Sequence, residues 1–170
     1  MAEQVISTAT GKPRNFLKTV FLTGLLAGVL DATAAMIQFM IRTNGGNPLK
    51  VWRFVASGIF GKEVATKNIW AMAGWGLLFH FFIAFCFTLF FFLIYPKIKL
   101  LSKNLISTGL CYGIFVWLIM NRIVVPLSNT TKIPFNLTQA IIGAGILMVC
   151  IGLPVSLLVG RYYSKLTFPH

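Results

Sequence analysis

The chain has 170 residues, of which 57 % are hydrophobic and only 11 % are charged. This composition excludes an ordinary soluble domain, because so short a chain could not bury that much apolar surface, whereas lipid accepts it. The net charge of +12 would fit nucleic acid in a soluble protein, but no nucleic-acid-binding motif is present, so we expect the Lys and Arg side chains to contact anionic lipid headgroups.

Four apolar windows are long enough to cross a hydrocarbon core of about 30 Å, at a rise of about 1.5 Å per residue. They comprise residues 17–42, 69–95, 104–125 and 137–160. We therefore predict an all-α fold, an integral membrane four-helix bundle over residues 17–160. A polar N-terminal tail, 1–16, is expected to precede it, and a C-terminal tail, 161–170, to follow it.

The first window contains a carboxylate, Asp31, at the depth where a charge is most costly. Small and polar residues follow one another there at intervals of three or four, so they lie on one face of a helix. This face comprises Gly24, Gly28, Asp31, Ala35, Gln38 and Arg42. The other faces are apolar and are expected to contact lipid.

The connection to the second window contains the turn sequence "NGGN" and then "PLKVWRFVASGIFG". Residues 48–60 are predicted to form a short amphipathic helix in the membrane interface, with Trp52 in its apolar stripe and Lys50 and Arg53 on another side. The alternative is a re-entrant half-helix, which would bring both cations into lipid.

The second window has one ionisable side chain near its middle, His80. Consecutive spans are antiparallel, so Asp31 and His80 are expected near the same depth, where a lone charge costs at least about 2.5–3.5 kcal/mol. Pairing reduces this cost, so the two should lie within hydrogen-bond reach, directly or through one water. Two further polar residues, Asn121 and Arg122, belong to the side of Gln38 and Arg42, and they could reach Asp31 only through a polar crevice.

Glycines at helical spacing predict close contacts between the spans. The candidate packing positions are Gly24, Gly28, Gly109, Gly113, Gly145 and Gly152. Three prolines add detail. Pro96 and Pro126 are each expected to end the preceding helix, and Pro154 to kink the last one and free a carbonyl near residue 150.

Catalytic chemistry is not indicated by the sequence. No nucleophile elbow, zinc motif, phosphate loop or carboxylate pair is present, and one intramembrane His does not supply two axial haem ligands within one chain. The three cysteines show no metal-ligand spacing. We expect no enzyme activity, no metal and no cofactor.

Two segments resemble a known group. "GLLAGVLDA" in the first span, together with His80 and "YPKIKL" at the end of the second, is similar to the YagU-like small bacterial inner-membrane proteins. The resemblance implies a four-span protein of the bacterial cytoplasmic membrane, without an established biochemical activity and with a link to acid tolerance. No site residue is transferred from that group.

Two functional hypotheses follow from the sequence. In the first, a homo-oligomer supports proton-linked or solute movement through a bundle centred on Asp31 and His80; the same pair could also be a purely structural hydrogen bond. In the second, the chain is a non-catalytic accessory subunit of a larger membrane complex. An even number of spans places both termini on one side, and the short, dense basic clusters favour the cytoplasm.

Overall fold

The computed structural model describes residues 16–65, 67–130 and 136–167, without the side chains of residues 65 and 165–167. These parts of the chain form helices and turns and contain no strand, which confirms the all-α prediction. The predicted N-terminal tail lies outside the described residues except for Phe16, which is helical.

Within the described residues, four helical spans are long and apolar enough to cross a membrane, so the chain is a multi-pass integral membrane protein. They are Phe16–Arg42, Ile69–Lys97, Leu105–Leu127 and Leu137–Ser164. The first span is the single helix α1, Phe16–Arg42. The second comprises α3, Ile69–Ile94, and a 3-10 turn over Tyr95–Lys97. A second 3-10 turn, Lys99–Ser102, leads to the third span.

The third and fourth spans are each interrupted by a five-residue π turn. The third consists of α4, Leu105–Ile119, a first π turn, Met120–Val124, and α5, Val125–Leu127. The fourth consists of α6, Leu137–Leu147, a second π turn, Met148–Gly152, and α7, Leu153–Thr167. The predicted C-terminal tail is thus helical as far as Thr167.

Each π turn is followed directly by one residue and then a proline: Val125 and Pro126 in the third span, Leu153 and Pro154 in the fourth. The N–H of Val125 donates to the Met120 carbonyl and that of Leu153 to the Met148 carbonyl, five residues back in both cases. The wider turn accommodates a proline ring that would clash inside a regular α-helix. Pro126 was predicted to end its helix, and the helix ends one residue after it, at Leu127.

Asparagines begin three of the four spans. The Asn68 side chain accepts from the N–H groups of Trp70 and Ala71, and the Asn104 side chain from those of Ile106 and Ser107. The Asn136 side chain accepts from Gln139 N–H. Each asparagine satisfies backbone donors that have no partner within the helix, and so fixes where the span starts.

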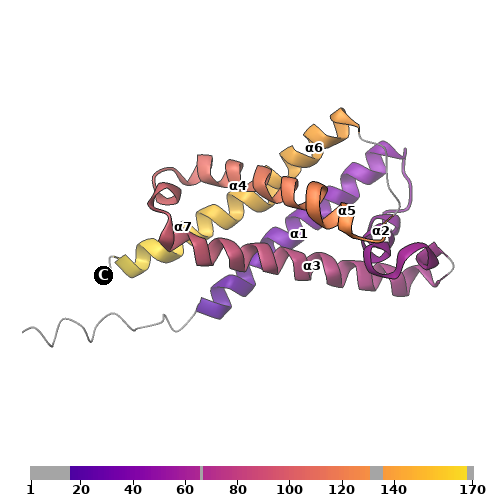
Figure 1. Cartoon of the computed structure of the whole chain (residues 1–170), viewed down its shortest axis with the longest axis horizontal. Helices are drawn as coiled ribbons and strands as arrows, with labels where there is room; N and C mark the ends of the chain where they lie inside the picture. Colours follow the sequence, from indigo (N-terminus) through magenta and orange to yellow (C-terminus); the bar gives the residue numbers. More distant parts are fainter. Residues whose placement is uncertain (1–15, 66, 131–135, 168–170) are drawn as a thin grey trace, which may run out of the picture.

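The spans pack antiparallel in an elongated bundle (Figure 1). We call the end where α1 begins and α7 ends the termini end, and the opposite end the α2 end. At the termini end, buried aromatic and aliphatic side chains form the main core, among them Phe91, Phe92, Tyr112 and Val155. Three interhelical hydrogen bonds to backbone carbonyls tie this core together: Tyr112 to Phe87, Ser156 to Leu105 and Tyr163 to Phe92.

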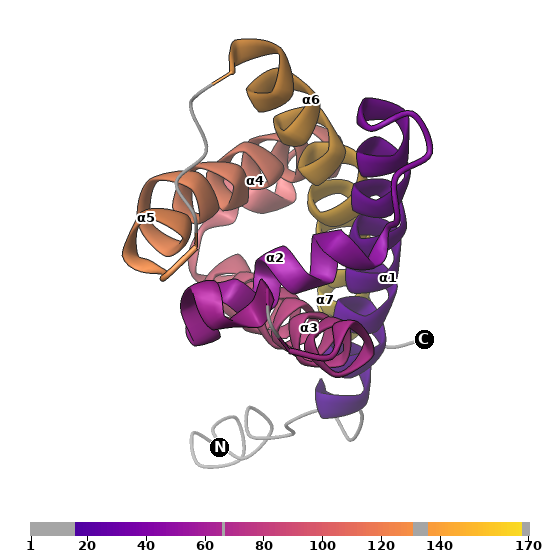
Figure 2. The ribbon, with the colours of Figure 1, turned by 90° about the vertical axis from the view of Figure 1, so that its right-hand side faces the viewer.

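At the other end, the short helix α2, Leu49–Phe60, runs across the bundle from α1 over α3 (Figure 2). It begins one residue later than predicted. Trp52 and Ala56 are buried, against Ala32 of α1 and against Ala73 and Met72 of α3. Because Met72 and Ala73 lie in the first two turns of α3, α2 packs against the bundle at its α2 end.

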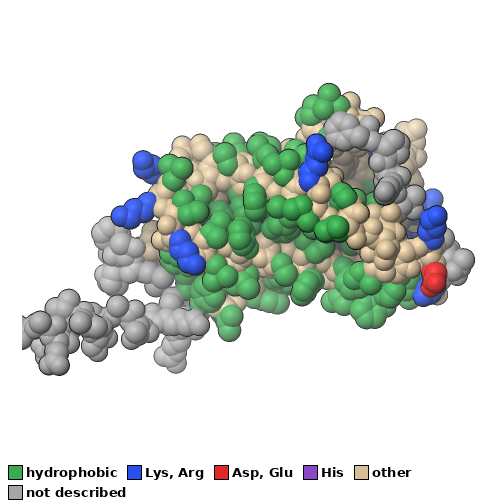
Figure 3. Space-filling model, viewed as in Figure 1, with side chains coloured by type: hydrophobic (Ala, Val, Ile, Leu, Met, Phe, Trp, Pro, Cys, Tyr) green, Lys and Arg blue, Asp and Glu red, His purple; other side chains and the backbone are tan. Residues whose placement is uncertain are grey.

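The surface is divided by residue type. Figure 3 shows hydrophobic side chains over the middle of one face and most Lys and Arg toward the two ends, with one basic side chain on the upper edge between them. On this face an acidic side chain is seen at the right-hand end, which is the α2 end. This distribution is typical of a chain whose middle is in lipid and whose ends are in water.

Candidate functional site

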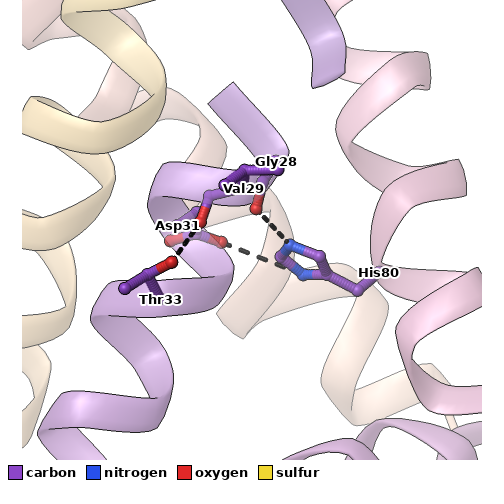
Figure 4. Close-up of polar contacts among 5 residues, drawn as sticks. All are labelled: Gly28, Val29, Asp31, Thr33 and His80. Carbon is purple, nitrogen blue, oxygen red and sulfur yellow. Dashed lines mark hydrogen bonds and ion pairs between the residues drawn. The ribbon is translucent and has the colours of Figure 1, made fainter. Parts of the chain in front are cut away.

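Asp31 and His80 meet at mid-depth between α1 and α3. Asp31 lies fifteen residues after Phe16 and eleven before Arg42, and His80 lies eleven residues after Ile69. The two side chains point toward each other (Figure 4), with Asp31 Oδ2 4.0 Å from His80 Nδ1. This is an ion-pair separation, longer than a direct hydrogen bond.

The other ring nitrogen of His80 contacts the backbone of α1. Nε2 lies 3.0 Å from the Gly28 carbonyl oxygen, and since a carbonyl only accepts, Nε2 carries a hydrogen and donates it. Nδ1 is left facing the Asp31 carboxyl. An unprotonated Nδ1 would oppose an ionised carboxylate, so the favourable states have one proton either on Nδ1 or on Asp31. The geometry thus places the His80 Nδ1 and the Asp31 carboxyl opposite each other, with the second ring nitrogen of His80 bonded to Gly28.

Aromatic rings surround the histidine. Trp52 of α2 has its ring centroid 5.2 Å from that of His80, and Phe81 has its centroid at 5.5 Å in an edge-on arrangement. The His80 and Asp31 side chains are 13 % and 15 % exposed. Aromatic walls lower the local dielectric, which strengthens the interaction between the two groups.

The second π turn also approaches this pair. Cys150, in that turn, lies within electrostatic range of Asp31. Its carbonyl receives no N–H from Pro154, four residues later, because proline has none. The position at which a freed carbonyl was predicted therefore lies in a π turn, close to Asp31.

A second polar contact lies two turns further along α1. Gln38 Nε2 donates to Gln139 Oε1 of α6 over 3.1 Å. Gln139 was not among the predicted site residues, although it is a solitary amide near the start of an apolar span, which is a usable signal. At about 1.5 Å per residue, Gln38 lies about 10 Å from Asp31, toward the α2 end.

The other predicted polar neighbours are not brought to the Asp31/His80 pair. Arg42 is exposed and lies over the ring of Phe39, 5.8 Å from its centroid. Asn121 donates 2.9 Å to the Trp117 carbonyl of its own helix, and Arg122 is exposed.

The two cations of α2 behave differently from each other. Lys50 is exposed, as expected for a side chain that reaches water or headgroups. Arg53 instead points back to the chain and donates 2.9 Å to the Val64 carbonyl, with its Nε buried and without a partner among the described residues. Arg53 therefore holds the 3-10 turn that follows α2, Gly61–Ala65, against this helix.

Five of the six predicted packing glycines lie at helix contacts. Added Cβ atoms on Gly24 and Gly28 would meet the rings of Phe85 and Phe81 of α3. Gly109 and Gly113 of α4 face the backbone of the second π turn, and Gly152 faces the backbone of α4. Gly145 is the exception, because an added Cβ there would meet nothing within 4 Å among the described residues. The prediction for Gly145 is therefore wrong within this chain.

Comparison of the chain with protein-family models, with curated proteins and with solved structures finds no match. The resemblance to the YagU-like group stays a prediction. Function therefore has to be argued from the site itself.

Proposed function

We propose that this membrane protein supports proton-linked or solute movement, with Asp31 and His80 as its proton-binding site and with several copies forming the conducting unit. One observation carries the proposal: a carboxyl and an imidazole face each other at mid-depth while the Gly28 carbonyl holds the second ring nitrogen as a donor. Ionisable groups at this depth are expensive and are usually kept for function.

Proton transfer within the pair needs little rearrangement. The contact from His80 Nε2 to Gly28 orients the ring, so the same Nδ1 faces Asp31 whether the pair has one proton on the imidazole or on the carboxyl. A four-helix unit has little room for a pore of its own, which is why the proposal includes an oligomer.

Flux into liposomes with an enclosed pH dye tests the proposal. Asp31→Asn keeps the shape of the side chain and removes its titration, and His80→Gln keeps an amide donor for Gly28. Both should lower proton flux by about tenfold or more, while the proteins remain folded. The matched control is Thr33→Val, two residues along α1, since Thr33 is exposed and bonds only to the Val29 carbonyl of its own helix.

Two results would count against a proton site. Wild-type flux equal to that of protein-free liposomes would remove the transport proposal. Wild-type flux retained in both Asp31→Asn and His80→Gln would leave the pair with a structural role only.

A second candidate is an accessory subunit of a larger membrane complex. It is favoured by the third span, of which only 17 % of the apolar window is buried within the chain. Such a face suits either lipid or a foreign helix. Purification from native membranes in mild detergent separates the two candidates, because stoichiometric foreign subunits would support the accessory role.

A further inference from the structure

A pocket of about 460 Å³ opens at the termini end of the bundle, remote from Asp31. The 3-10 turns after α3 and the last turns of α7 form its walls. Two cations line it, Lys99 from the connection and Arg161 from α7, together with the hydroxyl-bearing residues Ser102, Ser164 and Tyr95. It combines positive charge with hydrogen-bonding groups from distant parts of the sequence.

The cations of this end have no carboxylate partner among the described residues. The chain has three acidic residues. Asp31 is at mid-depth, Glu63 pairs with Lys67 at the α2 end over 3.5 Å, and Glu3 is outside the described residues. Five described cations lie at the termini end: Lys18, Lys97, Lys99, Lys103 and Arg161. Positive charge gathered in this way favours an anion from outside the chain.

The pocket lies where the apolar spans end. The second span ends at Lys97 and the fourth at Ser164. Tyr95 and Tyr163, which both line the pocket, stack with ring centroids 5.3 Å apart, and Tyr163 donates to the Phe92 carbonyl below. Tyrosines with an apolar body and a polar tip are enriched at the level of lipid headgroups. This depth is where a phosphate group of the membrane would be found.

We propose that this pocket binds an anionic phosphate group, carried either by a phospholipid headgroup or by a soluble phosphate ester. The planar guanidinium of Arg161 suits two phosphate oxygens at once, and Lys99 adds a compact charge from the opposite wall. The Ser102 and Ser164 hydroxyls, which now donate to the carbonyls of Lys99 and Arg161, can rotate to donate to a bound oxygen. The proposal does not depend on the function of Asp31.

Isothermal titration of the purified full chain in detergent tests the site with three probes. These are dioctanoyl phosphatidylglycerol, dioctanoyl phosphatidylcholine and glycerol 3-phosphate. The pocket variant is K99Q/R161Q. The matched control is K18Q/K97Q, which removes the same charge at the same end from exposed side chains that do not line the pocket. If the double variant fails to fold, K99Q and R161Q are tested singly.

We expect phosphatidylglycerol to bind at least about tenfold more tightly than phosphatidylcholine, whose own cation offsets its phosphate. The pocket variant should lose this preference and the control variant should keep it. Glycerol 3-phosphate binding with the same dependence on the variants would also support the site and would identify a soluble source. If both double variants lose the preference for phosphatidylglycerol equally, the attraction is spread over the surface and the proposal is overturned. An absence of binding by both anionic probes would also overturn it.

Discussion

At Gly76 the backbone of α2 comes so close to α3 that no side chain fits between them. A Cβ added there would overlap the Trp52 carbonyl group. Two residues earlier, Gly74 is on the outside of the same helix, and an added Cβ would meet nothing within 4 Å among the described residues. The two glycines therefore have different roles although they lie in one short stretch.

Substituting these two residues separates backbone contact from helix propensity. Gly76→Ala should lower the free energy of unfolding by about 1–3 kcal/mol, because the contacting atoms belong to backbone and cannot turn away. Gly74→Ala should be neutral or stabilising by up to about 1 kcal/mol. Unfolding of both variants in detergent, followed by circular dichroism, measures the difference; an equal effect of the two would contradict the close approach of α2.

The contacts of a single residue were predictable where its depth in the membrane alone determines its neighbours. Asp31 and His80 lie together because both are near the middle of antiparallel spans, which the rise per residue determines. Gln139 and Gly145 depend on how each helix is rotated about its axis. That rotation is set by the packing of all the side chains together, and no local pattern reports it.

At the scale of elements, α2 connects the α2 end of the bundle to the candidate proton site. Trp52 is only 4 % exposed. It packs against Ala32 of α1 and Ala73 of α3, and its ring contacts that of His80. The position of α2 therefore determines one wall around His80.

Removing the Trp52 ring should detach this helix. Trp52→Ala should cost about 3–5 kcal/mol of packing free energy, mostly in the attachment of α2, since the ring is buried between α1 and α3. Hydrogen exchange should then rise across residues 49–60 and stay low in the core of α3 near Phe91. Trp70→Ala is the control, because Trp70 is 71 % exposed, and it should leave the exchange of α2 unchanged. Unchanged exchange in Trp52→Ala would mean that other contacts hold α2.

The spans themselves were predictable from hydropathy, and their interruptions were not. Every span begins within one residue of its predicted start, because length and apolar content are local properties and asparagine caps mark three of the starts. The sequence places prolines at residues 126 and 154, but a proline can end a helix, kink it or follow a π turn. Which of these occurs depends on whether the neighbouring helices keep the chain in the membrane beyond it.

For the molecule as a whole, the positions of the Lys and Arg residues bear on which end of the bundle faces the cytoplasm. The bundle begins and ends at the same end, so the five cations whose side chains are described at the termini end all lie on one side of the membrane. The α2 end also has basic residues, but there α2 and the turn after it engage Arg53, and Glu63 pairs with Lys67. We expect the termini end to lie in the cytoplasm, because eight of the 15 Lys and Arg residues belong to that side by chain position and occur there in short, dense clusters.

Reporter fusions test this arrangement in a bacterial host. Green fluorescent protein fluoresces only when it stays in the cytoplasm, and alkaline phosphatase is active only when it is exported. We expect both the N-terminal and the C-terminal fusions to be fluorescent with the first reporter and inactive with the second. Opposite results at the two ends would require an odd number of crossings and would contradict the four spans. Phosphatase activity at both ends would leave the spans intact, place the basic pocket of Lys99 and Arg161 outside, and show that the small excess of cations does not decide sidedness here.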